Sequence, residues 1–301
     1  MDLNTRVTRR FLTAVALVGS GAGIAGCGGS SNKPANIVSA STGSSHKTIS
    51  LTRAADLSSD AAGYKLDMVM AETVSGQTIN ISANGSYTPK SHEASMTMDM
   101  ALPAIAGGEQ QFQMVLANDT LYMKFPTALT SQIPYGKPWM SFDLHSLSQA
   151  ANIPGLGSLI DSSSTLSDPG EYLDFLRAAA AGSVIDDGQE TVGGVQTTHY
   201  QAELQFSKLP DALPAADRSS TQQLINGLES KAKVPNFPAD VWIDGSGLVR
   251  RIMMNMKETV LGHQADTQVT ENFSDYGTQP PPTIPAAAQT TNLMSLVKAG
   301  G

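Results

Sequence analysis

Apolar and polar residues alternate strictly over several short segments, and this alternation limits the possible folds more than any other feature of the chain. The clearest segment is 94–100, where every second residue is apolar: Ala94, Met96, Met98 and Met100. A period of two is typical of a β-strand with one face in the core and the other in water. The same criterion predicts strands at residues 64–70, 79–82, 112–116, 121–125, 139–144, 197–206, 239–244, 249–257 and 267–276.

Turn sequences separate many of these strands, at Asn84-Gly85, Gly107-Gly108, Asn118-Asp119 and Asp244-Gly245-Ser246-Gly247. Consecutive strands joined by tight turns form an antiparallel meander. Two helices are predicted as well, one at 168–182 with Pro169 in its first turn and a weaker one at 219–231. A sheet with this many strands must curl, close or be covered. We therefore predict an α+β fold in which one strongly curved antiparallel sheet wraps over a few helices.

The N-terminal residues have the pattern of a secretory signal peptide. Arg6, Arg9 and Arg10 precede an uncharged apolar run over 11–25, which is followed by Gly26-Cys27. Small residues before a cysteine give a signal peptidase access, and the thiol is the group that diacylglyceryl transfer alkylates. We expect residues 1–26 to be a lipoprotein signal peptide and Cys27 to be lipidated; a signal anchor with a buried cysteine is the alternative. Twin-arginine and general secretory export both remain open.

Two further segments lack the bulky apolar residues that a packed core requires. Residues 27–50 are rich in Ser and Gly, which favours a disordered tether. Residues 279–301 begin with a proline run and continue with Ala and Gln, which favours a disordered tail. The folded domain is therefore predicted at 51–278, and deletion of the residues after Gln279 is expected to leave the melting temperature nearly unchanged.

The composition gives no sign of an enzyme, a metal centre or a nucleic-acid-binding protein. A net charge of −8 disfavours binding to a phosphate backbone. The folded region has neither a G-x-S-x-G elbow nor an HExxH motif, so we expect no catalytic residue, cofactor or metal. His199 is interpreted as a packed or hydrogen-bonded strand residue, and Asp186-Asp187-Gly188 as a turn.

Several motifs point to one family of proteins. Besides the residues around Cys27 and the tether, they are GKPW at 136–139, GQETVGGVQTTHY at 188–200, DVWID at 240–244, LVRRI at 248–252 and FSDYG at 273–277. Together they resemble actinobacterial cell-envelope lipoproteins of the LppX/LprG type. That family is similar to the LolA and LolB carriers, which implies a half-barrel around an apolar cavity closed by helices. It also implies that the chain binds or carries lipids or lipidated glycans.

Methionine is frequent in the alternating segments, with 13 residues in the chain. Unbranched, polarisable side chains adapt to irregular shapes, as a cavity wall for acyl chains requires. The residues expected to line it are Met68, Met70, Met96, Met98, Met114, Leu116, Met123, Leu176, Leu204 and Met254. The alternative is an ordinary core filled with methionine, in a surface-tethered structural or sensory module without lipid cargo.

The expected location is the extracytoplasmic face of the cell membrane, where acyl chains on Cys27 would anchor the protein. We expect a monomer whose partners are the membrane and a lipid or lipidated glycan. The long, weakly patterned stretch 143–166 is the predicted entrance flap of the cavity.

Overall fold

The computed structural model describes residues 51, 53–74, 77–102, 108–132, 137–143, 169, 173, 184–208, 218–219, 222, 226, 232–233, 236–260 and 263–293. The predicted signal peptide, Cys27, the tether, Leu176 and nearly all of the 143–166 flap lie outside these residues. No helix in the described part of the chain has the length and apolar character that crossing a bilayer requires.

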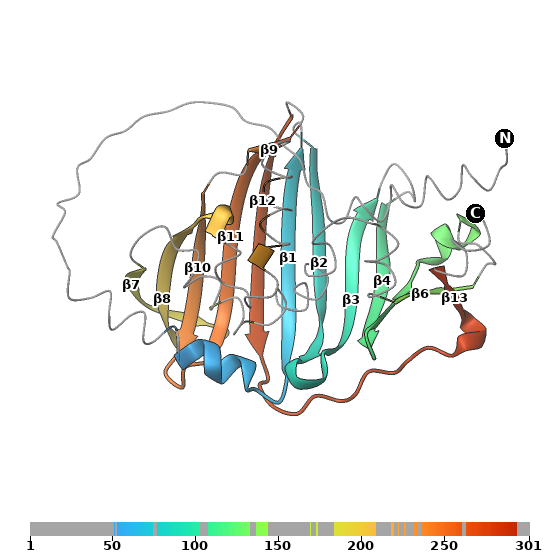
Figure 1. Ribbon diagram of the computed structural model, residues 1–301, viewed down its shortest axis with the longest axis horizontal. Coiled ribbons are helices and arrows are strands. Elements are labelled where there is room, and N and C mark those ends of the chain that lie inside the picture. The colour runs from blue at the N-terminus through green and yellow to red at the C-terminus, as the bar shows by residue number, and fades with distance from the viewer. Residues whose placement is uncertain are drawn as a thin grey trace.

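Within the residues just given, thirteen strands form one open sheet (Figure 1). Those of the first half are β1 (Tyr64–Val74), β2 (Gln77–Thr88), β3 (Glu93–Leu102), β4 (Gly108–Ala117), β5 (Thr120–Lys124) and β6 (Trp139–Asp143). Those of the second half are β7 (Ile185–Val192), β8 (Val195–Leu204), β9 (Ala232–Lys233), β10 (Phe237–Asp244), β11 (Val249–Val260), β12 (His263–Ser274) and β13 (Thr290–Asn292). The order across the sheet is β13-β6-β5-β4-β3-β2-β1-β12-β11-β10-β8-β7, with β9 on β11.

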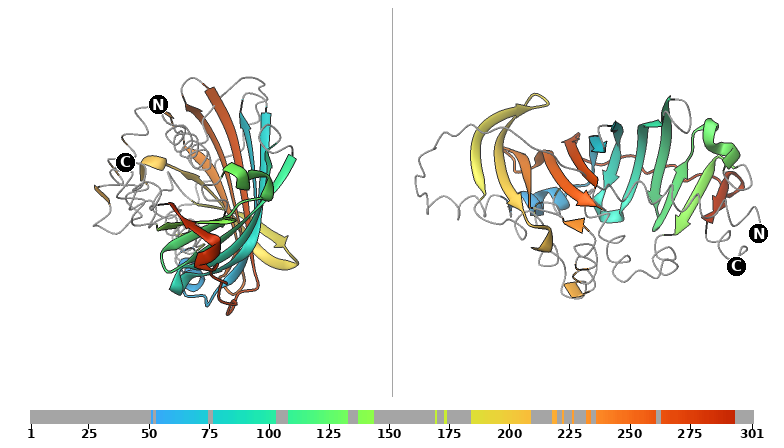
Figure 2. Two further views of the ribbon diagram at one scale, coloured as in Figure 1. Left: turned by 90° about the vertical axis from the view of Figure 1, so that its right-hand side faces the viewer. Right: turned by 90° about the horizontal axis from the view of Figure 1, so that it is seen from above.

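The predicted antiparallel meander is confirmed for both halves. Every pair of neighbouring strands is antiparallel except β13 and β6, and β1 pairs with β12 to join the two halves into one sheet. Asn118 and Asp119 both have positive φ, 51° and 54°, which matches the turn predicted there between β4 and β5. The sheet is curved, as the views along its edge and from above show (Figure 2).

The turn at Asp244 is held by its own carboxylate. Oδ1 accepts hydrogen bonds from the Ser246 hydroxyl and from the backbone N–H groups of Ser246 and Leu248, and Oδ2 accepts one from Arg250. Burial would raise the pKa of the Asp244 carboxyl, but these hydrogen bonds and the charge of Arg250 outweigh burial and lower the pKa. This turn therefore has a structural role, as the sequence predicts.

Helices are a small part of the described structure. Residues 53–59 form one that the alternation did not predict, at the end of the sheet near β10 and β11 (Figure 1). Its Ser58 hydroxyl accepts a hydrogen bond from the backbone of Val249. Residues 169 and 173 are helical within the first predicted helix, and 219, 222 and 226 within the second, with helical residue 218 directly before it. The wrapping of the sheet over helices remains a prediction, because most of 168–182 and 219–231 is outside the described residues.

Two predicted turns are wrong. Asn84 and Gly85 lie inside β2, where a Cβ on Gly85 would stand 2.1 Å from the Ser95 carbonyl oxygen and 2.7 Å from Met96 Cα. Glycine is needed here because β2 and β3 approach closely, whereas the sequence analysis interpreted Gly85 as a turn residue. Asp186 and Gly188 lie in β7, where the pairing with β8 shifts by one residue. A β-bulge, with Gly188 at a φ of 102°, therefore takes the place of the turn.

The predicted disordered tail is also corrected, for its first fifteen residues. Residues 278–289, here called the proline strap, run along the sheet and lead into β13, which pairs in parallel with β6 (Figure 1). The Lys137 ammonium donates hydrogen bonds to the carbonyls of Ala287 and Thr290. A polyproline segment has no internal hydrogen bonds, so composition alone does not distinguish a free one from one held by a neighbouring strand.

Candidate functional site

Strand register gives the sheet one apolar face. Residues paired across antiparallel strands point to the same side, so each row of partners can be followed from strand to strand. One row crosses eight strands from β4 to β8: Phe112, Met98, Ala83, Met68, Glu271, Ile252, Val241 and Tyr200. We call this side of the sheet the inner face and the opposite side, which carries Asp67, Ser82 and Gln113, the outer face.

The described residues of the inner face carry three apolar clusters, of which the smallest is built on Met140 and Phe142. The closed core lies mainly on β8 and β10–β12 and includes the 51–59 segment: Leu51, Ala54, Ala55, Tyr64, Leu66, Tyr87, Leu173, Tyr200, Ala202, Leu204, Phe237, Ala239, Val241, Ile243, Val249, Ile252 and Phe273. The methionine cluster lies on β1–β5 and is built on Ile81, Ala83, Met98, Met100 and Phe112. Its outer members are partly buried: Met68, Met70, Met96, Met114, Met123, Phe125 and Leu129.

The structure brings six of the ten predicted lining residues together. Met68, Met70, Met96, Met98, Met114 and Met123 all belong to the methionine cluster. Only Met98 among them is buried, at 7% exposed, while the other five keep part of their surface accessible. The first half of the inner face is therefore a methionine-rich surface that the described residues do not fully cover.

The other predicted lining residues lie elsewhere. Leu204 is completely buried in the closed core, and Met254 packs against that core. Leu116 is half-buried and pairs with Ala94 and Leu121. Leu204 therefore packs in the interior, away from the methionine-rich surface.

One charged residue stands among these apolar side chains. Glu271 lies on β12 between Val269 and Phe273, and it pairs with Met68 on one side and Ile252 on the other. It is 8% exposed, and no described residue provides a hydrogen-bond partner for its Oε2. Burial raises the pKa of the Glu271 carboxyl to about 7. Sequence reasoning missed this residue, although the alternation of β12 places it on the apolar side with Val269 and Phe273.

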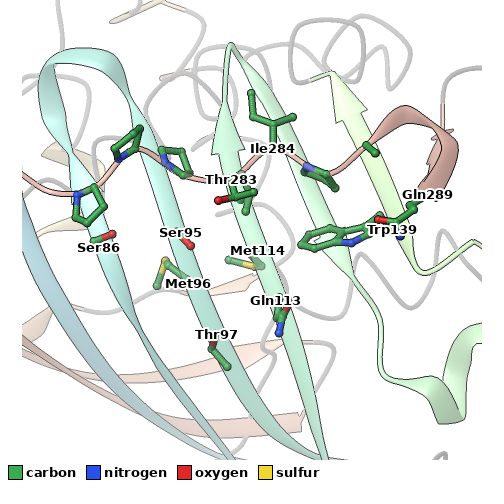
Figure 3. A pocket seen from close by; sticks show the side chains of 16 residues that line it. Ser86, Ser95, Met96, Thr97, Gln113, Met114, Trp139, Thr283, Ile284 and Gln289 are labelled. Atoms are coloured by element: carbon green, nitrogen blue, oxygen red, sulfur yellow. The ribbon is translucent and has the colours of Figure 1, made fainter.

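A groove lies on the outer face, beneath the proline strap. It has a volume of about 680 Å³ and is lined by the strap from Pro280 to Ala286, by Gln289 and by residues of β2, β3, β4 and β6 (Figure 3). Most of these strand residues are on the outer face, but Met96 and Met114 of the methionine cluster also line the groove. Trp139 stands at one end of it, with the Lys124 ammonium 5.9 Å from its ring. Val115 points to this side and is 5% exposed, as expected for an apolar outer-face residue beside the strap.

A polar cluster surrounds His199 on the other half of the outer face. The imidazole stacks on Trp242 with ring centroids 4.2 Å apart, and its Nε2 is 2.8 Å from an Asp240 oxygen. The Trp242 indole donates a hydrogen bond to Glu190. His199 is thus packed and hydrogen-bonded, as predicted. No group of three His, Cys, Asp or Glu side chains within the described ranges could hold a metal ion.

Comparison with known proteins gives few matches in sequence and several in structure. No family model matches the chain. An uncharacterised 31.2 kDa protein of Streptomyces griseus, from the rplA-rplJ intergenic region, is 26% identical over 198 residues. The match covers 65% of this chain and 61% of that protein, so it spans less than two thirds of the relative.

Two solved mycobacterial structures are similar to the chain over most of its length. LprF from Mycobacterium bovis is 12% identical, and the match covers 81% of this chain and 97% of LprF with a TM-score of 0.44. The lipoprotein LppX from Mycobacterium tuberculosis is 14% identical, with 80% of this chain and 99% of LppX covered and a TM-score of 0.41.

Proposed function

We propose that this chain is a membrane-anchored bacterial lipoprotein that binds or carries lipids or lipidated glycans on the inner face of its sheet. The methionine cluster is the observation that carries the proposal. Five of its methionines are only partly buried, on strands whose outer face is mostly polar. Leaving apolar side chains accessible to water is unfavourable, and covering them with an acyl chain recovers about 0.8 kcal/mol per buried methylene.

The choice of residue supports a ligand without a fixed shape. Methionine has three rotatable bonds and no branch, so neighbouring methionines can repack around chains of different length or bend. The closed core instead consists largely of branched and aromatic residues with fixed shapes. If the methionine cluster served stability alone, branched and aromatic residues of fixed shape would pack there more precisely than methionine. The methionine cluster therefore suits variable apolar cargo.

Blocking the cluster tests the proposal. Met98→Trp places a large side chain at the buried centre of the methionine cluster, and Ser82→Trp is the matched control on the exposed outer face of the adjacent strand. The measurements are thermal unfolding and retention of a fluorescent long-chain lipid. We expect Met98→Trp to lose lipid retention with its melting temperature nearly kept, and Ser82→Trp to retain both.

The alternative function predicts a different pair of results. In a solid core, Met98→Trp overpacks and lowers stability by about 1–3 kcal/mol. If that loss occurs and the wild-type protein retains no lipid, a surface-tethered structural or sensory module becomes the better description. The groove beneath the proline strap would then be the first place to look for a partner.

Anchoring through Cys27 is tested separately. Cys27→Ala removes the one thiol of the chain, so we expect the variant to leave the membrane fraction or to keep its signal peptide. Cell fractionation and the mass of the N-terminal peptide provide the readout. A correctly trimmed Ala variant that stays in the membrane would contradict lipidation at this residue.

A further inference from the structure

Glu271 lies at the junction of the closed core and the methionine cluster. On one side it pairs with Met68 of the methionine cluster, and on the other with Ile252 of the closed core. Its neighbours along the same face of β12 are Val269 and Phe273, both buried. The carboxylate therefore stands where a ligand covering the methionines would meet the edge of the closed core.

A buried acid without a partner is unfavourable for folding. An unsatisfied buried polar atom costs about 1–3 kcal/mol, and more when it is charged. Leucine or methionine would fit the alternation of β12 at no such cost, as Val269 and Phe273 do. Among the described residues, Glu271 Oε2 has no hydrogen-bond partner. Stability alone thus does not account for glutamate at this position.

The described protein also supplies no positive charge to this carboxylate. Most inner-face positions around Glu271 on β12, β1 and β11 hold apolar residues: Val269, Phe273, Leu66, Met68, Met70, Ile252 and Met254. The exception is Arg250, two residues before Ile252 on β11, and its guanidinium is already paired with the Asp244 carboxylate at 2.6 Å. A phosphate or carboxylate of a ligand placed here would meet the acid Glu271 and a cation that already has a partner, which disfavours anionic head groups.

Deepening the lipid-binding function proposed above, and resting on it, we propose that Glu271 is the polar contact of the site and accepts a hydrogen bond from a hydroxyl of an uncharged amphiphile. A hydroxyl supplies the donor that Oε2 lacks, and it can also accept a hydrogen bond from the O–H of the neutral acid. An ammonium head group would need the ionised acid and would leave two charges desolvated in an apolar setting, which is costly. The ligand class is therefore a neutral lipid with a free hydroxyl, such as a diacylglycerol or a glycosylated one.

Two matched ligands test this contact. 1,2-Dioleoylglycerol has one free hydroxyl, and its acetate ester has the same acyl chains without that donor. Each competes with a fluorescent long-chain lipid for the full-length protein. We expect wild type to prefer the alcohol by about tenfold, the effect of one hydrogen bond to a buried acceptor. In Glu271→Met the two ligands should compete equally, and in Glu203→Met, which removes an exposed outer-face acid, the preference should remain.

The outcomes separate this inference from the proposed function. If Glu271→Met binds lipid and keeps the tenfold preference, Glu271 is not the contact, while lipid binding itself stands. If wild type binds neither ligand, the lipid-binding function fails and the contact fails with it. If Glu271→Met folds poorly, a measurement on the wild-type protein still tests the contact. With ¹³C-labelled glutamate, the carboxyl resonance that Glu271→Gln removes should shift on adding the alcohol and stay in place with the acetate; equal shifts would overturn the inference.

Discussion

The closed core and the methionine cluster share one sheet and one pattern of alternation, but they bury their side chains to different extents. In the closed core, large residues such as Tyr64, Leu204 and Ile252 are almost completely buried. In the methionine cluster, most of the methionines remain partly accessible. The first region has the packing of a protein interior, and the second has the composition of an interior without its closure.

This difference indicates a division of roles along the sheet. Helical residues 53–59 and Leu173 contribute to the closed core, which has the aromatic contacts Tyr64–Phe273 and Tyr64–Tyr276 as well. Such contacts fix one arrangement of side chains. Methionine specifies an arrangement less strongly, which weakens a core but suits a surface that must accept cargo. Under the proposed function, stability therefore comes mainly from β8 and β10–β12, and the binding surface lies mainly on β1–β5.

Truncating one side chain in each region should give the largest difference between the two regions in the free energy of unfolding. Leu204→Ala removes a completely buried side chain from the closed core, so we expect a loss of about 2–5 kcal/mol in the free energy of unfolding. Met114→Ala removes a half-buried one from the methionine cluster and should cost below about 1.5 kcal/mol. Urea unfolding measures both. Equal losses would show that the methionine cluster is as tightly packed as the closed core.

The pH dependence of stability tests the burial of Glu271, which lies at the junction between the closed core and the methionine cluster. The folded state raises the pKa of Glu271 from 4.5 to about 7, so it holds this proton more tightly than the unfolded chain does. The free energy of unfolding should therefore fall as pH rises from about 4.5 to about 7, by roughly 3 kcal/mol in total, and level off above pH 7.

Glu271→Gln is the control for this pH dependence. It removes the titrating group with little change in shape, so the fall in stability between these pH values should disappear. Asp244, whose pKa is lowered, contributes stability that is lost only in acid below its ordinary pKa of 3.8, so it does not mask the effect. A wild-type protein whose stability is unchanged from pH 5 to pH 8 would contradict the burial of an unpartnered acid.

Removing the proline strap should have a smaller effect, confined to the methionine-rich half of the sheet. Deletion of the residues after Gly277 removes β13, the acceptors of Lys137 and the cover beside Val115. We expect a loss of about 1–2 kcal/mol and a red shift of the Trp139 fluorescence. A Trp242→Phe background isolates that signal, because the chain has two tryptophans. An unchanged melting temperature would show that the strap contributes nothing to stability, as expected for the disordered tail that the composition predicted.

Much of the sheet could be predicted because alternation reports burial on one face directly. Residues 94–100 alternate cleanly, and β3 has the expected bounds to within a few residues. The same pattern placed six methionines on one face. Gly85 shows where the method fails, since a glycine that permits a close approach and a glycine in a turn look alike in sequence.

The remaining features depend on partners that are far away in the chain. The proline strap is held by β6, whose pairing with β13 spans about 150 residues of sequence, as in the contact of Lys137 with Thr290. Glu271 could have been noticed as an acid in an apolar alternation. Its lack of a hydrogen-bond partner, however, follows from β1 and β11 lying on either side, which no local pattern contains. The helix at 53–59 is short, and its Ser58 hydroxyl bonds to the backbone of Val249 at the start of β11, about 190 residues away in sequence.

Native mass spectrometry of the protein purified without detergent tests the central claim most directly, that the methionine cluster holds a lipid. Wild type and Ser82→Trp are predicted to carry an additional mass in the range of a diacyl lipid, which collisional activation releases. Met98→Trp is predicted to have the mass of the chain alone while remaining folded. Wild-type protein without any bound mass, or a Met98→Trp variant with the same bound lipid as wild type, would contradict the account.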